Sequence, residues 1–207
     1  MRIALACTGA ALLLAAAVAA VLVAGKGASA PAVDPFRGSE PPVAIAMPDF
    51  ALRDQTGRIV RTEDLAGKVV VLTFLDTKCR EACPIIAGQI VQAWRLLTPT
   101  ERHESVAVAI STDPRDDTRP SVRAFLARHR ATRTIRYLAG SVPEMKQLWR
   151  RFQILSSLQS GEADTHSAPV RIYGRDLTWL ATQHPGADLS PGNLAHDVRF
   201  ALTRNQG

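Results

Sequence analysis

Apolar residues along the chain follow two patterns, one typical of buried strands and one of amphipathic helices. Near-continuous apolar runs rich in β-branched residues predict strands buried on both faces. These runs cover residues 68–75, 105–112 and 135–140. Apolar residues spaced three and four apart predict helices over residues 84–97, 119–130 and 142–152. Strands and helices therefore alternate, which indicates an α/β fold.

Further strands precede and follow this alternating region. Residues 49–65 alternate apolar and polar positions on both sides of a Gln-Thr-Gly turn, which predicts an N-terminal β-hairpin. Residues 168–182 predict two more strands, and Ser190-Pro191 begins a last amphipathic helix that extends to about Arg204. This order of elements predicts a thioredoxin-like α/β sandwich, around a mixed sheet, with an added N-terminal β-hairpin.

The N-terminal segment is apolar enough to enter a membrane. Residues 3–25 contain no charge and lie between Arg2 and Lys26. As a helix they would be about 35 Å long, against about 30 Å for a bilayer core. We expect one uncleaved N-terminal transmembrane helix. A cleaved signal segment is the alternative, because residues 28–30 read Ala-Ser-Ala.

Three regions follow from these patterns. We predict a membrane anchor or signal segment at residues 1–25, a flexible linker rich in Pro, Gly, Ser and Ala at 26–44, and a thioredoxin-like domain at 45–207. We expect single-pass attachment to the inner (cytoplasmic) membrane, with the domain on the periplasmic side. Such a compartment is oxidising, so paired cysteines there rarely remain idle thiols.

Composition narrows the classes of partner. With 207 residues, 46% of them hydrophobic and 21% charged, the chain has the composition of one globular domain. Its 25 Lys and Arg residues exceed its 19 Asp and Glu residues, which gives a net charge of +6. No nucleic-acid-binding motif accompanies this charge, so we interpret it as a solvated basic surface and expect no nucleic acid partner.

Two of the three cysteines stand in the stretch "DTKCREACP", between the first long strand and the helix after it. Cys79 and Cys83 are four residues apart, a spacing that places both side chains on one face of a helix. A helix N-terminus also favours thiolate over thiol. The pair is therefore a candidate for disulfide exchange or for metal binding, and a structural disulfide or inert packing is the remaining alternative.

A metal site needs at least a third ligand, and imidazole is the commonest partner of thiolates for copper or zinc. His166 ends a polar loop immediately before a predicted core strand. In a thioredoxin-like fold this loop lies beside the cysteine-bearing turn. The other histidines are expected at exposed element ends, in a turn or on the polar face of a helix, and they are His103, His129, His184 and His196.

Several segments together resemble the Sco/SenC family of membrane-anchored copper chaperones for cytochrome c oxidase assembly. They are "PDFALRDQTGRIVRTEDLAGKVVVLTF", "CREACP", "ISTDPRDDTRPSVRAFL" and "DTHSAPVRIYG", within residues 45–204. The resemblance implies that one copper ion, Cu(I) or Cu(II), is held by Cys79, Cys83 and His166. It also implies delivery of copper to the binuclear copper site of oxidase subunit II.

A second function uses the same cysteines. In a membrane-tethered thiol-disulfide oxidoreductase, Cys79 would attack and Cys83 would resolve, and the resemblance allows this role as a reductant of the acceptor's cysteines. Enzymatic activity therefore stays open, with metal delivery as the primary role. A peroxiredoxin is disfavoured because Thr77 and Thr73 do not match its Thr and Pro positions. Structural zinc usually needs four protein ligands.

The chain departs from the family pattern at two places. Arg80 and Glu81 follow the first cysteine where members often have Pro and Asp. Thr165 directly precedes His166 where many members have Asp, and Asp164 stands one place earlier. A carboxylate near a metal-bound imidazole commonly orients the ring, so this shift is expected to alter the site.

Three more acids follow the second long strand: Asp113, Asp116 and Asp117. We expect them to end the strand and to cap the next helix. A role in partner docking is the alternative, because their loop should lie at the same end of the sheet as the cysteines.

Overall fold

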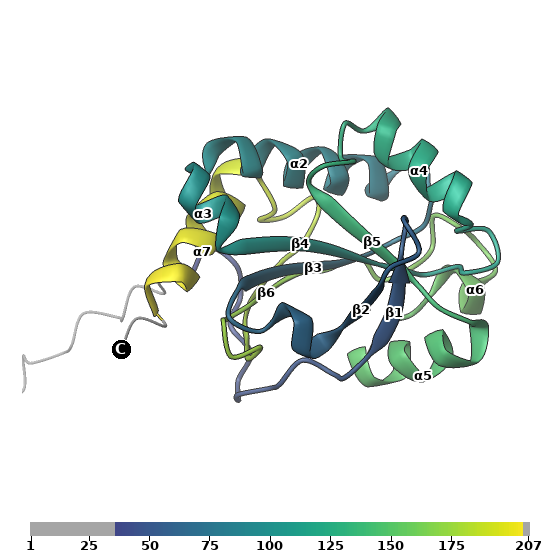
Figure 1. The fold of residues 1–207 in the computed structure, drawn as a ribbon, viewed down its shortest axis with the longest axis horizontal. Coiled ribbons are helices and arrows are strands. Elements are labelled where there is room, and N and C mark those ends of the chain that lie inside the picture. The colour runs from purple at the N-terminus through teal and green to yellow at the C-terminus, as the bar shows by residue number, and fades with distance from the viewer. Residues whose placement is uncertain (1–35, 205–207) are drawn as a thin grey trace, which may run out of the picture. The chain divides into compact units, whose positions relative to one another are not determined.

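The computed structural model describes residues 36–204, which form a seven-stranded sheet with helices on both faces (Figure 1). The strands are β1 (Ala51–Asp54), β2 (Ile59–Arg61), β3 (Val69–Leu75), β4 (Ser105–Ser111), β5 (Ile135–Ala139), β6 (Val170–Tyr173) and β7 (Trp179–Gln183). The helices are η1 (Thr62–Leu65), α2 (Ala82–Leu96), α3 (Pro99–His103), α4 (Arg119–Arg128), α5 (Val142–Phe152), α6 (Ser157–Ser160) and α7 (Pro191–Arg204).

The sheet is mixed, with strand order β2-β1-β5-β4-β3-β6-β7. The three central strands β5, β4 and β3 are parallel, and the two hairpins at the edges pair antiparallel to them. The predicted α/β sandwich with an added N-terminal hairpin is confirmed. Two short helices, α3 and α6, were not predicted, because a single turn is too short to show helical periodicity.

Strand β3 divides the core into two apolar layers. Val69, Val71 and Leu75 pack with buried residues of α2, α4 and α7 on one face. Leu72 and Phe74 pack with α5 on the other face, and all of these β3 side chains are fully buried. Figure 1 shows α2 and α4 above the sheet and α5 below it. Successive residues of a strand point to opposite faces, so a continuous apolar run is what a strand covered on both sides requires.

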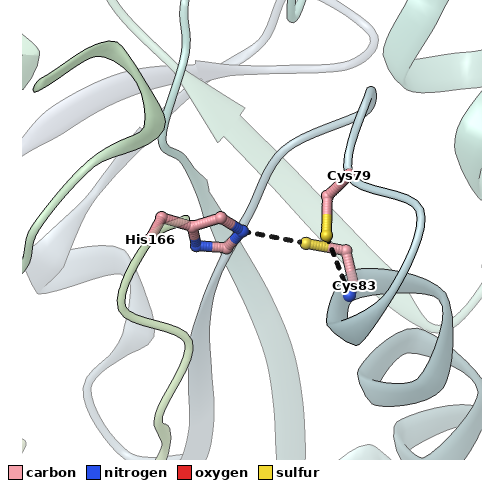
Figure 2. A group of neighbouring side chains, drawn as sticks. All are labelled: Cys79, Cys83 and His166. Carbon is pink, nitrogen blue, oxygen red and sulfur yellow. Dashed lines mark hydrogen bonds between the residues drawn. The ribbon is translucent and has the colours of Figure 1, made fainter. Parts of the chain in front are cut away.

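The pairing of β6 with β3 brings two distant loops together. Because these strands are antiparallel, with Leu72 opposite Arg171, the start of β6 lies toward the carboxyl end of β3. The loop after β3 carries the cysteines and the loop before β6 carries His166. The two loops therefore meet at one end of the sheet (Figure 2).

The predicted transmembrane helix lies outside the described residues. Within residues 36–204, no helix combines the length and the hydropathy that a membrane crossing requires.

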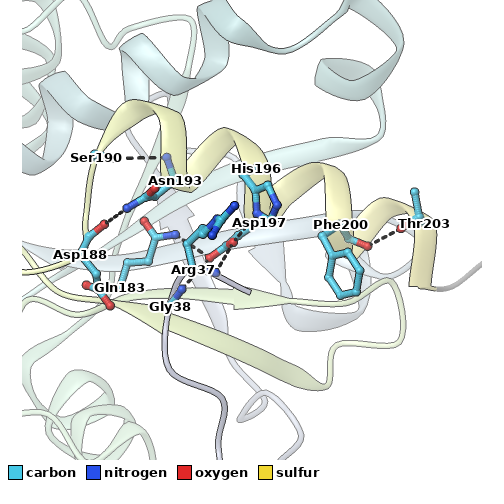
Figure 3. Close-up of polar contacts among 10 residues, drawn as sticks. All are labelled: Arg37, Gly38, Gln183, Asp188, Ser190, Asn193, His196, Asp197, Phe200 and Thr203. Atoms are coloured by element: carbon cyan, nitrogen blue, oxygen red, sulfur yellow. Dashed lines mark hydrogen bonds and ion pairs between the residues drawn. The ribbon is translucent and has the colours of Figure 1, made fainter. Parts of the chain in front are cut away.

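A buried carboxylate joins the beginning of the described chain to its last helix (Figure 3). Asp197 of α7 is fully buried and accepts the backbone N–H groups of Arg37 and Gly38 at 2.7 and 3.0 Å. It also accepts the side-chain amide of Gln183 at 2.6 Å. Ser39 then forms a β-bridge with Thr182 of β7. The packed structure thus includes residues that the sequence analysis assigned to the linker.

Replacing Asp197 should destabilise the fold strongly. We expect Asp197→Ala to lower the free energy of unfolding by about 3 kcal/mol, because it leaves buried N–H donors without an acceptor. Urea denaturation measures this difference. Asp176→Ala, which changes an exposed carboxylate in a turn, is the matched control and should cost less than about 1 kcal/mol. Equal losses in the two variants would contradict the assigned role of Asp197.

Candidate metal centre

The two cysteines stand where a loop passes into a helix. β3 ends at Leu75, and the buried carboxylate of Asp76 then accepts the N–H of Lys78 at 2.7 Å in a tight Asx-type turn. Helix α2 begins at Ala82, which places Cys83 in its first turn and Cys79 just before it. The predicted position between strand and helix is confirmed.

The two sulfurs are close together and almost shielded from solvent. The backbone N–H of Cys83 lies 3.3 Å from Cys79 Sγ, and the N–H of Asp76 lies 3.4 Å from Cys83 Sγ. Cys79 is 4% exposed and Cys83 is fully buried, and neither forms a disulfide. Each sulfur thus accepts a backbone N–H, an arrangement that stabilises negative charge on it.

His166 completes the cluster from the opposite loop (Figure 2). Its Nε2 lies 3.2 Å from Cys83 Sγ, and its Nδ1 lies 3.1 Å from the carbonyl oxygen of Ser167. In the neutral ring, Nδ1–H donates to that carbonyl and the Nε2 lone pair faces the sulfurs. One ligand atom from each of the three residues lies within 4.8 Å of the others. The structure therefore brings together the three residues predicted as metal ligands.

The pKa values of the two cysteines shift in opposite directions. The S–H of Cys83 donates a hydrogen bond to the sulfur of Cys79, and this bond lowers the pKa of Cys79. Burial opposes the shift and His166 adds to it, so that the pKa of Cys79 is about 5. The same hydrogen bond, together with burial, raises the pKa of Cys83 far above the usual range of a thiol. At neutral pH the pair is one thiolate and one thiol.

The same neighbours shift the pKa of the His166 imidazole. Burial alone would lower the pKa of His166, but its interaction with the Cys79 thiolate and its hydrogen bond to the Ser167 carbonyl outweigh burial and raise that pKa. The negative charge on Cys79 thus favours a protonated ring when no cation is present. A bound cation would take the place of that proton between the same atoms.

The remaining histidines do not join the cluster. His103 and His184 are exposed, and His196 contacts Asp197 at 3.0 Å. His129 differs from its expected exposure, because its half-buried ring packs against Phe125 with 4.6 Å between the ring centroids. Burial and the neighbouring Arg128 accordingly lower the pKa of His129.

A buried acid supports the cysteine loop, and sequence reasoning assigned it a different role. Asp117 accepts the N–H of Thr77 at 2.9 Å, the hydroxyl of Ser111 at 2.6 Å and the hydroxyl of Tyr137 at 2.7 Å. Burial raises the Asp117 pKa to about 6, although these hydrogen bonds oppose the shift. The predicted acidic cap is wrong, because Thr118 caps α4. Asp117 instead fixes the loop behind Cys79.

The acidity of Cys79 predicts its reactivity. Alkylation of Cys79 by iodoacetamide should rise with pH to half its maximal rate near pH 5, because the pKa of this thiol is about 5 and only the thiolate reacts. Cys83 should stay unmodified in the folded protein. Mass spectrometry of the two modified peptides measures both rates.

The variant Cys83→Ala is the control for this experiment. It removes the S–H donor, so the midpoint for Cys79 should move toward the ordinary thiol value of about 8.5. A wild-type midpoint already at that value would contradict the assigned hydrogen bond.

Comparisons with known proteins place the chain in a family. A family model described as SCO1/SenC matches residues 39–203. A Stutzerimonas stutzeri protein whose name describes it as copper-binding is 26% identical over 138 residues, which are 63% of this chain and 65% of that protein. This match spans slightly less than two thirds of that relative's length. An SCO2-like protein of Rickettsia conorii is 24% identical over 157 residues, covering 73% of this chain and 74% of that protein.

Solved structures share the fold. ScoI of Bradyrhizobium japonicum, with copper bound, superposes with a TM-score of 0.65 at 21% identity and covers 76% of this chain and 99% of its own. The thioredoxin domain of a Bacteroides vulgatus thiol-disulfide oxidoreductase gives 0.58 at 13% identity, covering 75% and 94%. The fold is therefore thioredoxin-like. Because the family model matches most of the chain, this protein belongs to the SCO1/SenC family.

Proposed function

We propose that this protein is a copper chaperone that delivers copper to the binuclear copper site of cytochrome c oxidase during its assembly. The observation that carries the proposal is the convergence of two sulfurs and one imidazole nitrogen within 4.8 Å at the end of the sheet. Copper is the transferred cargo, and Cys79, Cys83 and His166 are its proposed ligands.

The chemistry of the three ligands suits copper. Thiolates favour the soft ion Cu(I), and imidazole binds both Cu(I) and Cu(II). Cys79 is already a thiolate at neutral pH, so binding releases a proton from Cys83 and, where the ring is protonated, from His166. Three protein ligands leave one position open to an incoming ligand of the acceptor. An open position is what transfer between two proteins requires.

The proposed location of the domain is compatible with the choice of acceptor. We propose that residues 1–25 anchor the chain in the inner membrane, with the domain on the periplasmic side, because residues 3–25 are uncharged. A tethered domain remains close to membrane-bound partners, which raises the effective concentration of the pair. Subunit II of the oxidase, or another copper or thiol acceptor at the same membrane, is the proposed partner.

Thiol-disulfide exchange is the second candidate function, and the low pKa of Cys79 favours it. The Cys79 thiolate would attack one sulfur of a partner disulfide, form a mixed disulfide and release the other sulfur as a thiolate, which takes up the proton that Cys83 loses in the next step. Cys83 would then displace the partner from the mixed disulfide. The products are a Cys79–Cys83 disulfide and a partner with two thiols, ready to receive copper.

Copper titration tests the chaperone proposal. The wild-type protein should bind one copper ion, and His166→Ala should bind it about 100-fold more weakly because a ligand is lost. Competition with bicinchoninate measures the affinity for Cu(I). His184→Ala, which changes an exposed histidine outside the cluster, is the matched control and should bind like the wild type.

The same variants separate the two candidate functions. If His166→Ala binds copper as tightly as the wild type, the three-ligand site is refuted. If it loses copper but still supports oxidase assembly in cells, thiol-disulfide exchange becomes the main role.

A further inference from the structure

Asp164 ties the histidine loop to the cysteine loop. Its Oδ1 accepts the backbone N–H of Arg80 at 2.6 Å and that of Glu81 at 3.3 Å. Glu81 is the N-cap residue of α2, and its own side chain makes no capping hydrogen bond. The carboxylate of Asp164 therefore supplies, from a distant part of the chain, an acceptor and a negative charge at the start of this helix.

The bond to Arg80 depends on the absence of proline at that position. Proline has no backbone N–H, so it could not donate to Asp164. The sequence departs from the resembling family at two positions, with Arg80 in place of proline and an acid one place earlier than expected. The structure places these departures at the two ends of one hydrogen bond. The hydrogen bond between Arg80 and Asp164 therefore requires both departures.

Asp164 binds the backbone of the cysteine loop and also interacts with the side chain of Cys79, but no hydrogen bond joins it to the imidazole. The Nδ1 of His166 faces the carbonyl of Ser167, and Thr165 donates its hydroxyl to Glu162 within the same loop. Beyond the histidine, the N–H of Ser167 donates to the carbonyl of Leu155 at 2.9 Å. His166 is thus held between two anchors, one on the cysteine loop and one on the chain after α5.

We infer that Asp164 is a positioning residue that holds His166 within reach of the two sulfurs before a metal ion arrives, through the N–H of Arg80. Its effect on copper binding rests on the proposed function, whereas the contact between the loops does not. Because the loop is already ordered, copper binding does not incur the entropy cost of ordering it.

Three variants of the full-length protein test the inference. Arg80→Pro removes the N–H donor and Asp164→Ala removes the acceptor, and each should weaken Cu(I) binding about tenfold. Arg80→Ala keeps the donor and should retain wild-type affinity. The double variant Arg80→Pro/Asp164→Ala should bind no more weakly than Asp164→Ala alone, because Asp164→Ala already removes the acceptor of both N–H groups.

Amide hydrogen exchange of the metal-free protein is the second readout. In Asp164→Ala the amides of Arg80 and Glu81 should exchange at least tenfold faster, and Asp164→Asn, which keeps an oxygen acceptor, should partly restore protection. If the wild type binds no copper but the exchange results hold, the proposed function fails and the positioning role stands. Unchanged exchange in Asp164→Ala, or an Arg80→Ala protein that behaves like Arg80→Pro, overturns the inference.

A separate observation concerns the route to Cys79. A groove of about 500 Å³ opens on this residue, and its charged lining consists of Lys78, Arg80 and Arg128, with no Asp or Glu. Lys78 is paired with Asp116 at 2.7 Å. Neither Arg80 nor Arg128 takes part in an ion pair among the described residues, although the Asp164 carboxylate interacts electrostatically with Arg80. Both guanidinium groups are exposed and make the groove basic.

We propose that this groove receives an acidic segment that flanks the reactive cysteines of the partner protein. We choose an acidic segment because its charge is complementary to the groove. A partner sulfur that approaches Cys79 through the groove passes both guanidinium groups. Electrostatic steering of this kind raises association rates by about 10-fold or more. A second hollow shares Lys78 with this groove. Its lining holds more acids than bases, with Asp76, Asp113, Asp116 and Glu162 against Lys78 and Arg115, so it attracts an acidic segment less.

The test uses two synthetic disulfide peptides. One has Glu beside the cysteine, and the other has Lys at the same position. The reduced, full-length protein should reduce the Glu peptide about tenfold faster at low ionic strength, and salt should shrink this difference. Arg80→Ala/Arg128→Ala should abolish the preference, and Arg133→Ala, outside the groove, should keep it. Equal rates for the two peptides with the wild type, or a faster Lys peptide, would overturn the proposal.

Discussion

The contact between His166 and Cys83 depends on the register of two strands. β6 pairs antiparallel with β3, and this pairing sets where the preceding loop meets the carboxyl end of β3. A shift of one residue would turn every side chain of β6 to the opposite face and would bury Arg171 in place of Ile172. Because that exchange would place a charge in the apolar core, the core itself specifies the position of the imidazole.

The cysteine loop is held by polar groups that the apolar core surrounds. Asp76 and Asp117 are almost fully buried, and their carboxylates accept backbone N–H groups of Lys78 and Thr77. Buried carboxylates are costly unless every oxygen finds donors, so such groups persist where they fix one conformation. The loop that carries the sulfurs is therefore fixed by buried hydrogen bonds, and of the two sulfurs only that of Cys79 borders an open groove. A fixed loop and one accessible sulfur suit both metal transfer and thiol exchange.

Local sequence patterns predicted much of this arrangement, and long-range contacts explain the rest. The strands and long helices follow from periodicity, and the position of the cysteines follows from the order of strand and helix. Asp164 was noticed only as a displaced acid, because its partner is a backbone N–H 84 residues away in the chain, and no side-chain pattern reveals such a donor. Asp117 was assigned to a cap because three acids share one loop, and only tertiary packing distinguishes the buried one.

The segment that precedes β1 has a consequence for solubility. β7 is the last strand of the sheet, and its outer side would present unpaired backbone groups to other molecules. Bridges from Ser39 to Thr182 and from Ala46 to Thr178, just ahead of the strand, cover this side, and Asp197 holds the covering segment in place. An exposed strand edge is a template for pairing between copies of a protein. The segment that contains Ser39 and Ala46 thus covers the edge of β7 and opposes edge-to-edge aggregation.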